Sequence, residues 1–216
     1  MDIQSIVIQI FVVLFAITVH EASHGWAAHK MGDPTAYASG RVTLNPLAHI
    51  DPIGTILMPI VLYVGSGGRF TFGWAKPVPV NPYNLRHPRR DNLWISFAGP
   101  VANLLTAAGS AVLFLAVKAW YAGMSPSSAM VKPVVGLANL LIAAFTTNMV
   151  LAFFNLIPVP PLDGSGILEG LLSDQAAAQY ERLRPYGFIV IMILIFTRIL
   201  DFIYIPIGIL RNLLIR

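Results

Sequence analysis

Apolar residues in this chain fall into five long runs that carry almost no charge. The runs cover residues 3–19, 53–68, 93–117, 134–162 and 185–210. A helix needs about 20 apolar residues to cross the hydrocarbon core of a membrane. The first run reaches that length if its helix continues to Ala28, and the third and fourth exceed it. The pattern therefore predicts an all-α membrane protein, a polytopic helical bundle of about five to six membrane segments.

Two of the runs depart from a simple spanning helix. The run 53–68 is short and ends in glycines, which favours a broken or re-entrant element. The run 185–210 contains Arg198 and Asp201, which are three residues apart and could pair on a helix.

The connections between the runs contain two candidate strands. Alternating residues at 36–44 indicate a short hairpin strand. Residues 70–80 combine aromatic and β-branched side chains with prolines at alternate positions, which is typical of an edge strand. We therefore expect a small re-entrant β element, whose free edge could pair with an extended substrate. The connection 118–132 looks like a simple turn between two helices.

Composition supports a membrane location. Of the 216 residues, 56% are hydrophobic and 11% are charged, whereas soluble domains carry about 25% charged residues. The net charge of +4 comes from basic residues in the connections, as in membrane proteins, so we expect the lipid bilayer as a partner and no nucleic acid. The chain has no cysteine. We expect one membrane-embedded domain over residues 1–216, with the first run retained as a helix.

A histidine–glutamate motif follows directly on the first apolar run. Residues His20-Glu21-Ala22-Ser23-His24 form an H-E-x-x-H pattern. On a helix, positions i and i+4 lie on one face, so both imidazoles can reach one metal ion. Glu21 lies about 100° further round, where it can hold a water molecule and take its proton. The alternative is two helix-end histidines beside a solvated glutamate, but a metal would offset the cost of burying these groups.

A catalytic zinc site needs a third protein ligand. His29 is the nearest candidate, but on a helix it would point about 140° away from His24. His49 and His87 lie in polar loops, where we expect them to be solvated or to cap backbone groups.

Asp163 is the better third ligand. It follows the proline-rich run 155–162 and is the only charged residue between Lys132 and Glu169. Prolines end a helix, and irregular backbone at membrane depth is tolerated only where it lines a protein cavity. The alternative is that Asp163 acts as the N-cap of a helix over 164–172.

Two asparagines are candidates for contacting the substrate. Asn155 could donate a hydrogen bond to the substrate backbone or to the oxyanion, or it could cap backbone groups freed by Pro158. Asn103 could play a similar part, or serve as an amide that packs between helices.

The H-E-x-x-H motif and the run 155–164 together resemble the site-2 protease family of intramembrane metalloproteases. Residues 40–49 and 72–81, and the run Gly99-Pro100-Val101-Ala102-Asn103, are similar to further family motifs. The resemblance covers roughly residues 5–172. It suggests a compact member without a PDZ-like insertion or a nucleotide-binding domain.

The resemblance implies a zinc metalloprotease that cuts within the transmembrane segments of its substrates, in regulated intramembrane proteolysis. One Zn²⁺ per chain would be held by His20, His24 and Asp163, with Glu21 as the base. The expected substrate is a single-pass membrane protein or a signal-peptide remnant, and the sequence names no regulatory partner.

Basic residues predict the orientation of this site. Positive charges collect on the cytoplasmic side of membrane proteins. Lys30 follows the run that carries the H-E-x-x-H motif, and the basic cluster at 86–90 precedes the run 93–117. If residues 53–80 leave and return without a net crossing, Asp163 reaches the depth of His20. We therefore expect an integral protein of a prokaryotic cytoplasmic membrane, with its active site towards the cytoplasm.

Two other classes of protein fit parts of this pattern. A transporter or channel would also use broken helices and buried charges, but the chain shows no internal repeat. A catalytically silent scaffold would not need the acid at Glu21.

Overall fold

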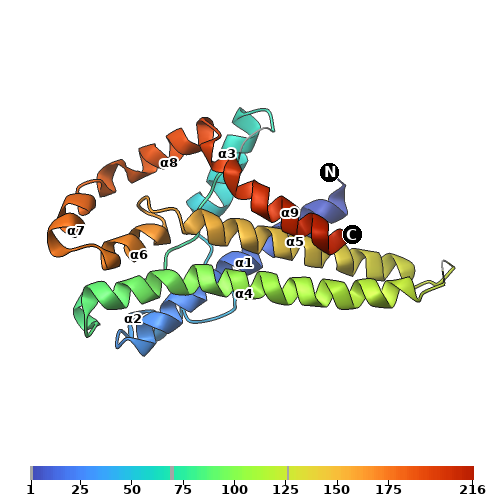
Figure 1. Ribbon diagram of the computed structural model, residues 1–216, viewed down its shortest axis with the longest axis horizontal. Coiled ribbons are helices and arrows are strands. Elements are labelled where there is room, and N and C mark those ends of the chain that lie inside the picture. Colours follow the sequence, from blue (N-terminus) through green and yellow to red (C-terminus); the bar gives the residue numbers. More distant parts are fainter. Residues whose placement is uncertain (1, 69–70, 126) are drawn as a thin grey trace.

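Three long helices form the centre of the computed structural model, which describes residues 2–68, 71–125 and 127–216. They are α1 (Ile3–Lys30), α4 (Pro88–Ala122) and α5 (Val131–Asn155). Each is long and apolar enough to cross a membrane. Figure 1 shows α4 and α5 running side by side, with α1 packed against both. The all-α bundle predicted from the apolar runs is confirmed.

The remaining helices are short and gather round this centre. Along the chain come α2 (Thr35–Ala38), a π-helical turn (Pro52–Leu57) leading into α3 (Met58–Gly65), then α6 (Asp163–Leu171), α7 (Asp174–Glu181), α8 (Gly187–Phe196) and α9 (Tyr204–Ile215). Short 3-10 turns cover Pro46–Ala48, Pro82–Asn84, Arg184–Tyr186 and Ile199–Ile203. The connection between α4 and α5 is the expected short turn (Figure 1).

The C-terminal apolar run is bent by 72° between α8 and α9. Arg198, at the break, has a φ of 60°, a left-handed conformation that a helix cannot continue through. Its Nε donates to Asp201 Oδ2 at 2.8 Å, so the expected pair forms, but at the break and not along a helix. The described residues therefore contain three spanning helices, or up to four if the bent pair is one span. The sequence estimate of five to six segments is higher.

No strand forms within the described residues, so the prediction of a small β element is wrong. Phe70, the first residue of one predicted strand, lies outside them. Residues 71–80 have no regular structure, because Pro77 and Pro79 have no N–H to give to a ladder. Instead, single backbone bonds hold the segment, from Trp74 N to Gly54 O at 3.1 Å and from Lys76 N to His49 O at 3.0 Å.

The predicted hairpin strand at 36–44 is also not formed. Its first residues belong to α2, and Gly40 then turns the chain with a φ of 68°. A non-glycine residue would be strained there, so local turn chemistry overrides the alternating pattern.

Buried Asp33 fixes the end of the 71–80 segment to the end of α1. Its carboxylate accepts from Asn81 N at 2.7 Å, from Asn84 Nδ2 at 2.8 Å and from Thr35 N at 3.1 Å. Burial raises the pKa of the Asp33 carboxyl, but the hydrogen bonds from Asn84, Thr35 and Asn81 outweigh it and hold the pKa below its usual range. The charged form of Asp33 therefore anchors this segment.

The molecule buries few of its large apolar side chains. The main cluster lies between α4, α5 and the C-terminal helices and consists of Ala107, Phe145, Met149, Leu200, Ile203 and Ile207. Many other large apolar residues point outward, including Ile3, Ile10 and Leu105. An apolar outer surface of this extent needs lipid around it. The protein is therefore an integral membrane protein.

Candidate metal centre

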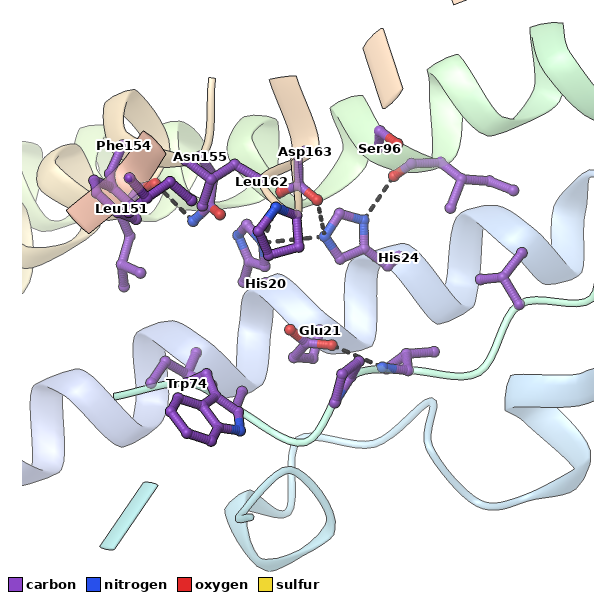
Figure 2. Close-up of a pocket in the computed structure, with 18 of the residues that line it drawn as sticks. His20, Glu21, His24, Trp74, Ser96, Leu151, Phe154, Asn155, Leu162 and Asp163 are labelled. Atoms are coloured by element: carbon purple, nitrogen blue, oxygen red, sulfur yellow. Dashed lines mark hydrogen bonds and ion pairs between the residues drawn. The ribbon is translucent and has the colours of Figure 1, made fainter. Parts of the chain in front are cut away.

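The two motif histidines lie one turn apart on α1 and point to the same place. Their Nε2 atoms are 3.0 Å apart, and both side chains are almost fully buried. Figure 2 shows both rings beside Asp163, at the start of α6. The helical spacing of the H-E-x-x-H motif thus brings both imidazoles to one point.

Asp163, far from the histidines in the sequence, reaches the same point from the start of α6. Its Oδ2 lies 3.0 Å from His20 Nε2, and its Oδ1 lies 3.3 Å from His24 Nε2. Asp163 is the first residue of α6, and Leu162 holds the N-cap position of this helix, so the alternative of Asp163 as the N-cap is wrong. The next residue must be glycine, because a Cβ on Gly164 would clash with Leu156 O and Ile157 O.

Hydrogen bonds on the far side of each ring select its tautomer. His24 Nδ1 lies 2.7 Å from Ile95 O, a carbonyl that can only accept, so Nδ1 carries the proton. His20 Nδ1 lies 2.6 Å from Asn103 Oδ1. Asn103 Nδ2 donates elsewhere, so Oδ1 is the acceptor there too. In the neutral rings both Nε2 atoms therefore present lone pairs to the carboxylate.

This meeting of lone pairs fits a metal ion. Two bare imidazole nitrogens and a carboxylate repel one another unless a cation lies between them, and Asp163 Oδ2 is buried without a hydrogen-bond partner. A tetrahedral zinc with bonds of about 2.0–2.1 Å separates its ligands by about 3.3 Å, close to the distances given above. Within the described residues, His20, His24 and Asp163 form the one group of this kind. Two imidazoles and a carboxylate suit zinc.

Sequence features on α4 make room for the histidines. Gly99 packs against both rings, and a Cβ there would lie 2.5 Å from His24 Nε2 and 2.7 Å from His20 Cε1. Pro100 follows inside the helix and has no N–H for the ladder. In the turn before it, Ile95 O lies 2.7 Å from His24 Nδ1.

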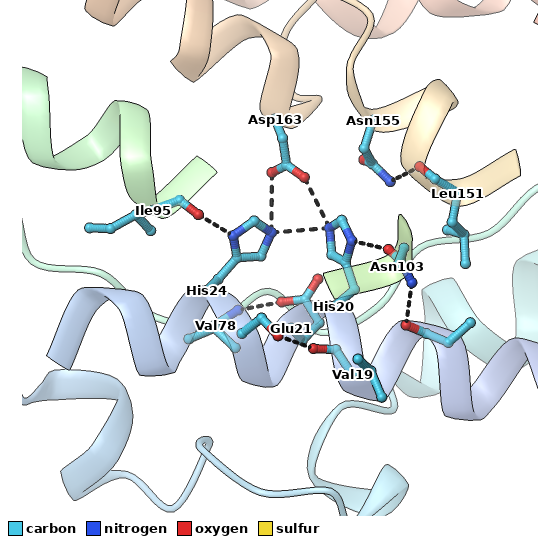
Figure 3. A network of polar contacts seen from close by, with 12 residues as sticks. Val19, His20, Glu21, His24, Val78, Ile95, Asn103, Leu151, Asn155 and Asp163 are labelled. Atoms are coloured by element: carbon cyan, nitrogen blue, oxygen red, sulfur yellow. Dashed lines mark hydrogen bonds and ion pairs between the residues drawn. The ribbon is translucent and has the colours of Figure 1, made fainter. Parts of the chain in front are cut away.

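Glu21 lies beside the histidines and faces a cavity of about 470 Å³. Its Oε2 accepts from Val78 N at 3.0 Å (Figure 3). The extended segment 72–80 therefore forms one wall of the cavity and holds the carboxylate of Glu21. The other walls come from α4, α5 and α6. This arrangement leaves a carboxylate next to the candidate metal centre, where it can exchange a proton with water.

We expect the Val78→Pro substitution to lower the rate of peptide hydrolysis about tenfold. Proline has no N–H, so Glu21 would lose the donor that orients it. A general base contributes roughly 100-fold or more to the rate, and the loss of its orientation should remove a fraction of that contribution. Val80→Pro is the matched control, because Val80 lines the same cavity and, like Val78, directly follows a proline. Equal rates in the two variants, measured on one peptide substrate, would contradict the role of the Val78 amide.

The structure places the two asparagines differently. Asn155 lines the cavity, and its Nδ2 donates to Leu151 O at 3.0 Å, one turn back on α5. Asn103 is fully buried, and its side chain contacts His20, Ala16 and Asn148. A role in contacting substrate stays a prediction for Asn155. The contacts of Asn103 indicate instead that it supports His20.

The other histidines lie away from the metal centre. The His29 ring stacks on Tyr37, with centroids 4.7 Å apart. His49 is 1% exposed and bonds to the backbone oxygen Thr43 O through Nε2, so of the two expected roles it is not solvated but pairs with a backbone group. His87 precedes α4 and makes no side-chain capping bond.

Sequence reasoning missed three residues near the site. Val78 acts through its backbone, which no side-chain motif reveals. Gly99 was part of a recognised motif, but only the packing shows that histidine rings lie against it. Asn148, one of three asparagines in the apolar run 134–162, was a signal that could have been followed, because buried amides at membrane depth need partners.

Comparisons with known proteins identify the family of the chain. The family model "Peptidase family M50" matches residues 8–197. A Bacillus subtilis (strain 168) protein named "Putative zinc metalloprotease YwhC" is 39% identical over 188 residues, which are 87% of this chain and 80% of that protein. In Mycolicibacterium smegmatis, "Putative zinc metalloprotease Rip2" is 29% identical over 87% of this chain and 66% of its own length.

A Rip2 protein of Mycobacterium tuberculosis (strain H37Rv) is 27% identical over 84% of this chain. The chain thus spans four fifths of the Bacillus relative, but 63–66% of these two mycobacterial ones. No solved structure matches it significantly. The family match covers most of the chain and includes His20, Glu21, His24 and Asp163, so the resemblance seen in the sequence is confirmed, and this chain belongs to peptidase family M50.

Proposed function

We propose that the protein is an intramembrane zinc metalloprotease, which hydrolyses peptide bonds within the transmembrane segments of membrane proteins. The observation that carries the proposal is the convergence of His20, His24 and Asp163, with Glu21 beside them, inside a bundle of apolar helices. The names of the bacterial relatives support the protease chemistry. The placement of the site within spanning helices supports the intramembrane part.

The residues divide the chemistry between them. One zinc per chain, held by the two histidines and Asp163, would supply Lewis-acid activation of water and of the scissile carbonyl. Glu21 takes the proton of the attacking water and passes it to the leaving nitrogen. Val78 N holds the Glu21 carboxylate in place for both transfers. The Asn155 amide, on the cavity wall, donates to the substrate backbone or to the oxyanion.

The cavity accounts for water exclusion and for substrate choice. Its lining is mostly apolar, with Phe72, Trp74, Phe154 and Phe188 around the polar groups. An apolar peptide, locally unwound, can bury its side chains there while its backbone meets the metal centre. The substrate class that fits is a single-pass membrane protein or the remnant of a signal peptide.

The basic residues support a cytoplasmic orientation of the site. Lys30 ends α1, and Arg86, Arg89 and Arg90 lie at the start of α4. These ends lie together at the same side of the bundle, opposite the α4–α5 turn and both chain termini (Figure 1). Positive charges collect on the cytoplasmic side, so the metal centre lies in the cytoplasmic half of a prokaryotic cell membrane.

The test is cleavage of single-pass membrane proteins by the purified protein in detergent, with the cut sites mapped by mass spectrometry. We expect cuts inside the apolar segment that disappear in the Asp163→Asn variant and after zinc removal, and that return when zinc is added back. Cuts outside the membrane segment would contradict the intramembrane assignment. Cuts that persist in Asp163→Asn would show a contaminating protease.

A further inference from the structure

A chain of buried amides connects His20 to α5, on the side of the ring away from the candidate metal. His20 Nδ1 donates to Asn103 Oδ1 at 2.6 Å. Asn103 Nδ2 donates to Asn148 Oδ1 at 2.8 Å and to Ala16 O at 3.1 Å. Asn148 Nδ2 donates to Ala144 O at 2.9 Å. Figure 3 shows the first links of this chain, from His20 through Asn103 to the α1 backbone.

Burial makes the chain a fixed structure. Asn103 and Asn148 are both 0% exposed, and His20 is 6% exposed. A buried amide that loses its hydrogen-bond partner destabilises the folded protein. The partners of each amide therefore decide its orientation.

The direction of every bond follows from the last acceptor. Ala144 O is a carbonyl and can only accept, so it takes the NH₂ end of Asn148 and leaves Oδ1 facing Asn103. Facing that oxygen, Asn103 must turn its own NH₂ end towards Asn148 and Ala16. The carbonyl end of Asn103 then faces His20, where it accepts from Nδ1–H. The Nε2 lone pair of His20 is left for the metal ion.

We propose that Asn148 is a positioning residue for the zinc site, acting on His20 through Asn103. Without Asn148, the Asn103 amide can flip, because only Ala16 O would then hold its NH₂ end. A flipped amide presents NH₂ to His20 and favours the opposite tautomer, with the proton on Nε2, which cannot bind a metal. The inference rests on the proposed zinc site and adds a residue on a third helix, α5, that influences how tightly zinc is bound.

The effect is expected in metal affinity. Groups that orient a metal-bound histidine from outside contribute about 10–100-fold to affinity. Asn148→Leu keeps a similar volume and removes both ends of the amide, so its zinc dissociation constant should rise by about 10–100-fold. Asn139→Leu is the control, because it removes an amide from the same helix at an exposed position that makes no hydrogen bond to His20 or Asn103.

The experiment measures zinc affinity of the full chain in detergent by competition with a chromophoric chelator, for the wild type, Asn148→Leu, Asn103→Leu and the double variant. Because Asn148 acts through Asn103, the double variant should bind zinc no more weakly than Asn103→Leu alone. The absorption spectrum of the cobalt-loaded protein should change in Asn148→Leu, since the ligand field of His20 is altered. The melting temperature of the metal-free protein is measured for every variant, so that a loss of folding stability is separated from a loss of zinc affinity.

Each outcome decides the matter. Unchanged zinc affinity and cobalt spectrum in Asn148→Leu, or independent effects that multiply in the double variant, would overturn the proposal. The proposal would also be overturned if metal-free Asn148→Leu melted at a lower temperature and this loss of folding stability alone explained its weaker zinc binding. If leucine prevents folding, Asn148→Val, which is smaller than the native side chain, takes its place. Absence of zinc binding in the wild type would instead refute the proposed function.

Discussion

The Glu21→Gln variant is expected to lose peptide-bond cleavage while keeping its zinc. Glutamine has the same length and can still accept from Val78 N through its carbonyl oxygen, so the 3.0 Å contact can be kept. It has no basic oxygen to take a proton from water. Removal of a general base costs about 10²–10⁴-fold in rate, and cleavage should fall by that amount.

Zinc content separates the two ways in which Glu21 could matter. The carboxylate is not one of the three atoms that converge on the metal centre, so zinc bound per chain should match the wild type. Loss of zinc together with activity would assign Glu21 to holding the site and not to proton transfer.

A matched control is available on the surface. Glu181, at the end of α7, is exposed, and Glu181→Gln makes the same change in charge away from the cavity. It should cleave the same membrane substrate at the wild-type rate. Cleavage by Glu21→Gln at the rate of this control would eliminate Glu21 as the base, and with it the mechanism proposed above.

The Gly99→Ala variant is expected to lose zinc binding, although it adds a single methyl group. That methyl would lie 2.5 Å from His24 Nε2 and 2.7 Å from His20 Cε1. Both rings are held on their other sides by Ile95 O and Asn103, so they cannot simply move away. Displacing two ligands at once should weaken zinc binding by at least about 100-fold, the upper end of what outer contacts contribute.

Gly109→Ala makes the same change on the same helix and is the control. A Cβ on Gly109 meets nothing within 4 Å, and alanine favours a helix over glycine. Zinc titration and cleavage by Gly109→Ala should match the wild type. Normal zinc binding by Gly99→Ala would mean that α4 does not press against the histidines as the structure has it.

Residues close together in the sequence are enough to predict the helical bundle and the motif on α1. Apolar runs predict spanning helices because unpaired backbone groups are too costly in lipid, and the helix satisfies them within one segment. The spacing of His20 and His24 predicts one shared point because the helical repeat sets it. Both conclusions depend on residues close together in the chain, so the sequence alone suffices.

Turn chemistry and long-range contacts decided against the predicted strands. The alternating pattern at 36–44 gave way to α2 and a glycine turn. The 71–80 segment, which lacks donors at its prolines, found separate partners on Gly54, His49 and Glu21. Periodicity does not say which distant groups will be within reach, and so it could not reveal this outcome.

The sequence by itself therefore determined the membrane-helical class, the family motifs and the types of side chain that a zinc site requires. Tertiary structure alone decided that Asp163 meets the two histidines 143 and 139 positions earlier, that Gly99 leaves room for their rings, and that Asn148 sets the orientation of Asn103. The physical reason is that helical geometry is local, whereas the packing of α4, α5 and α6 round α1 depends on contacts between residues far apart in the chain.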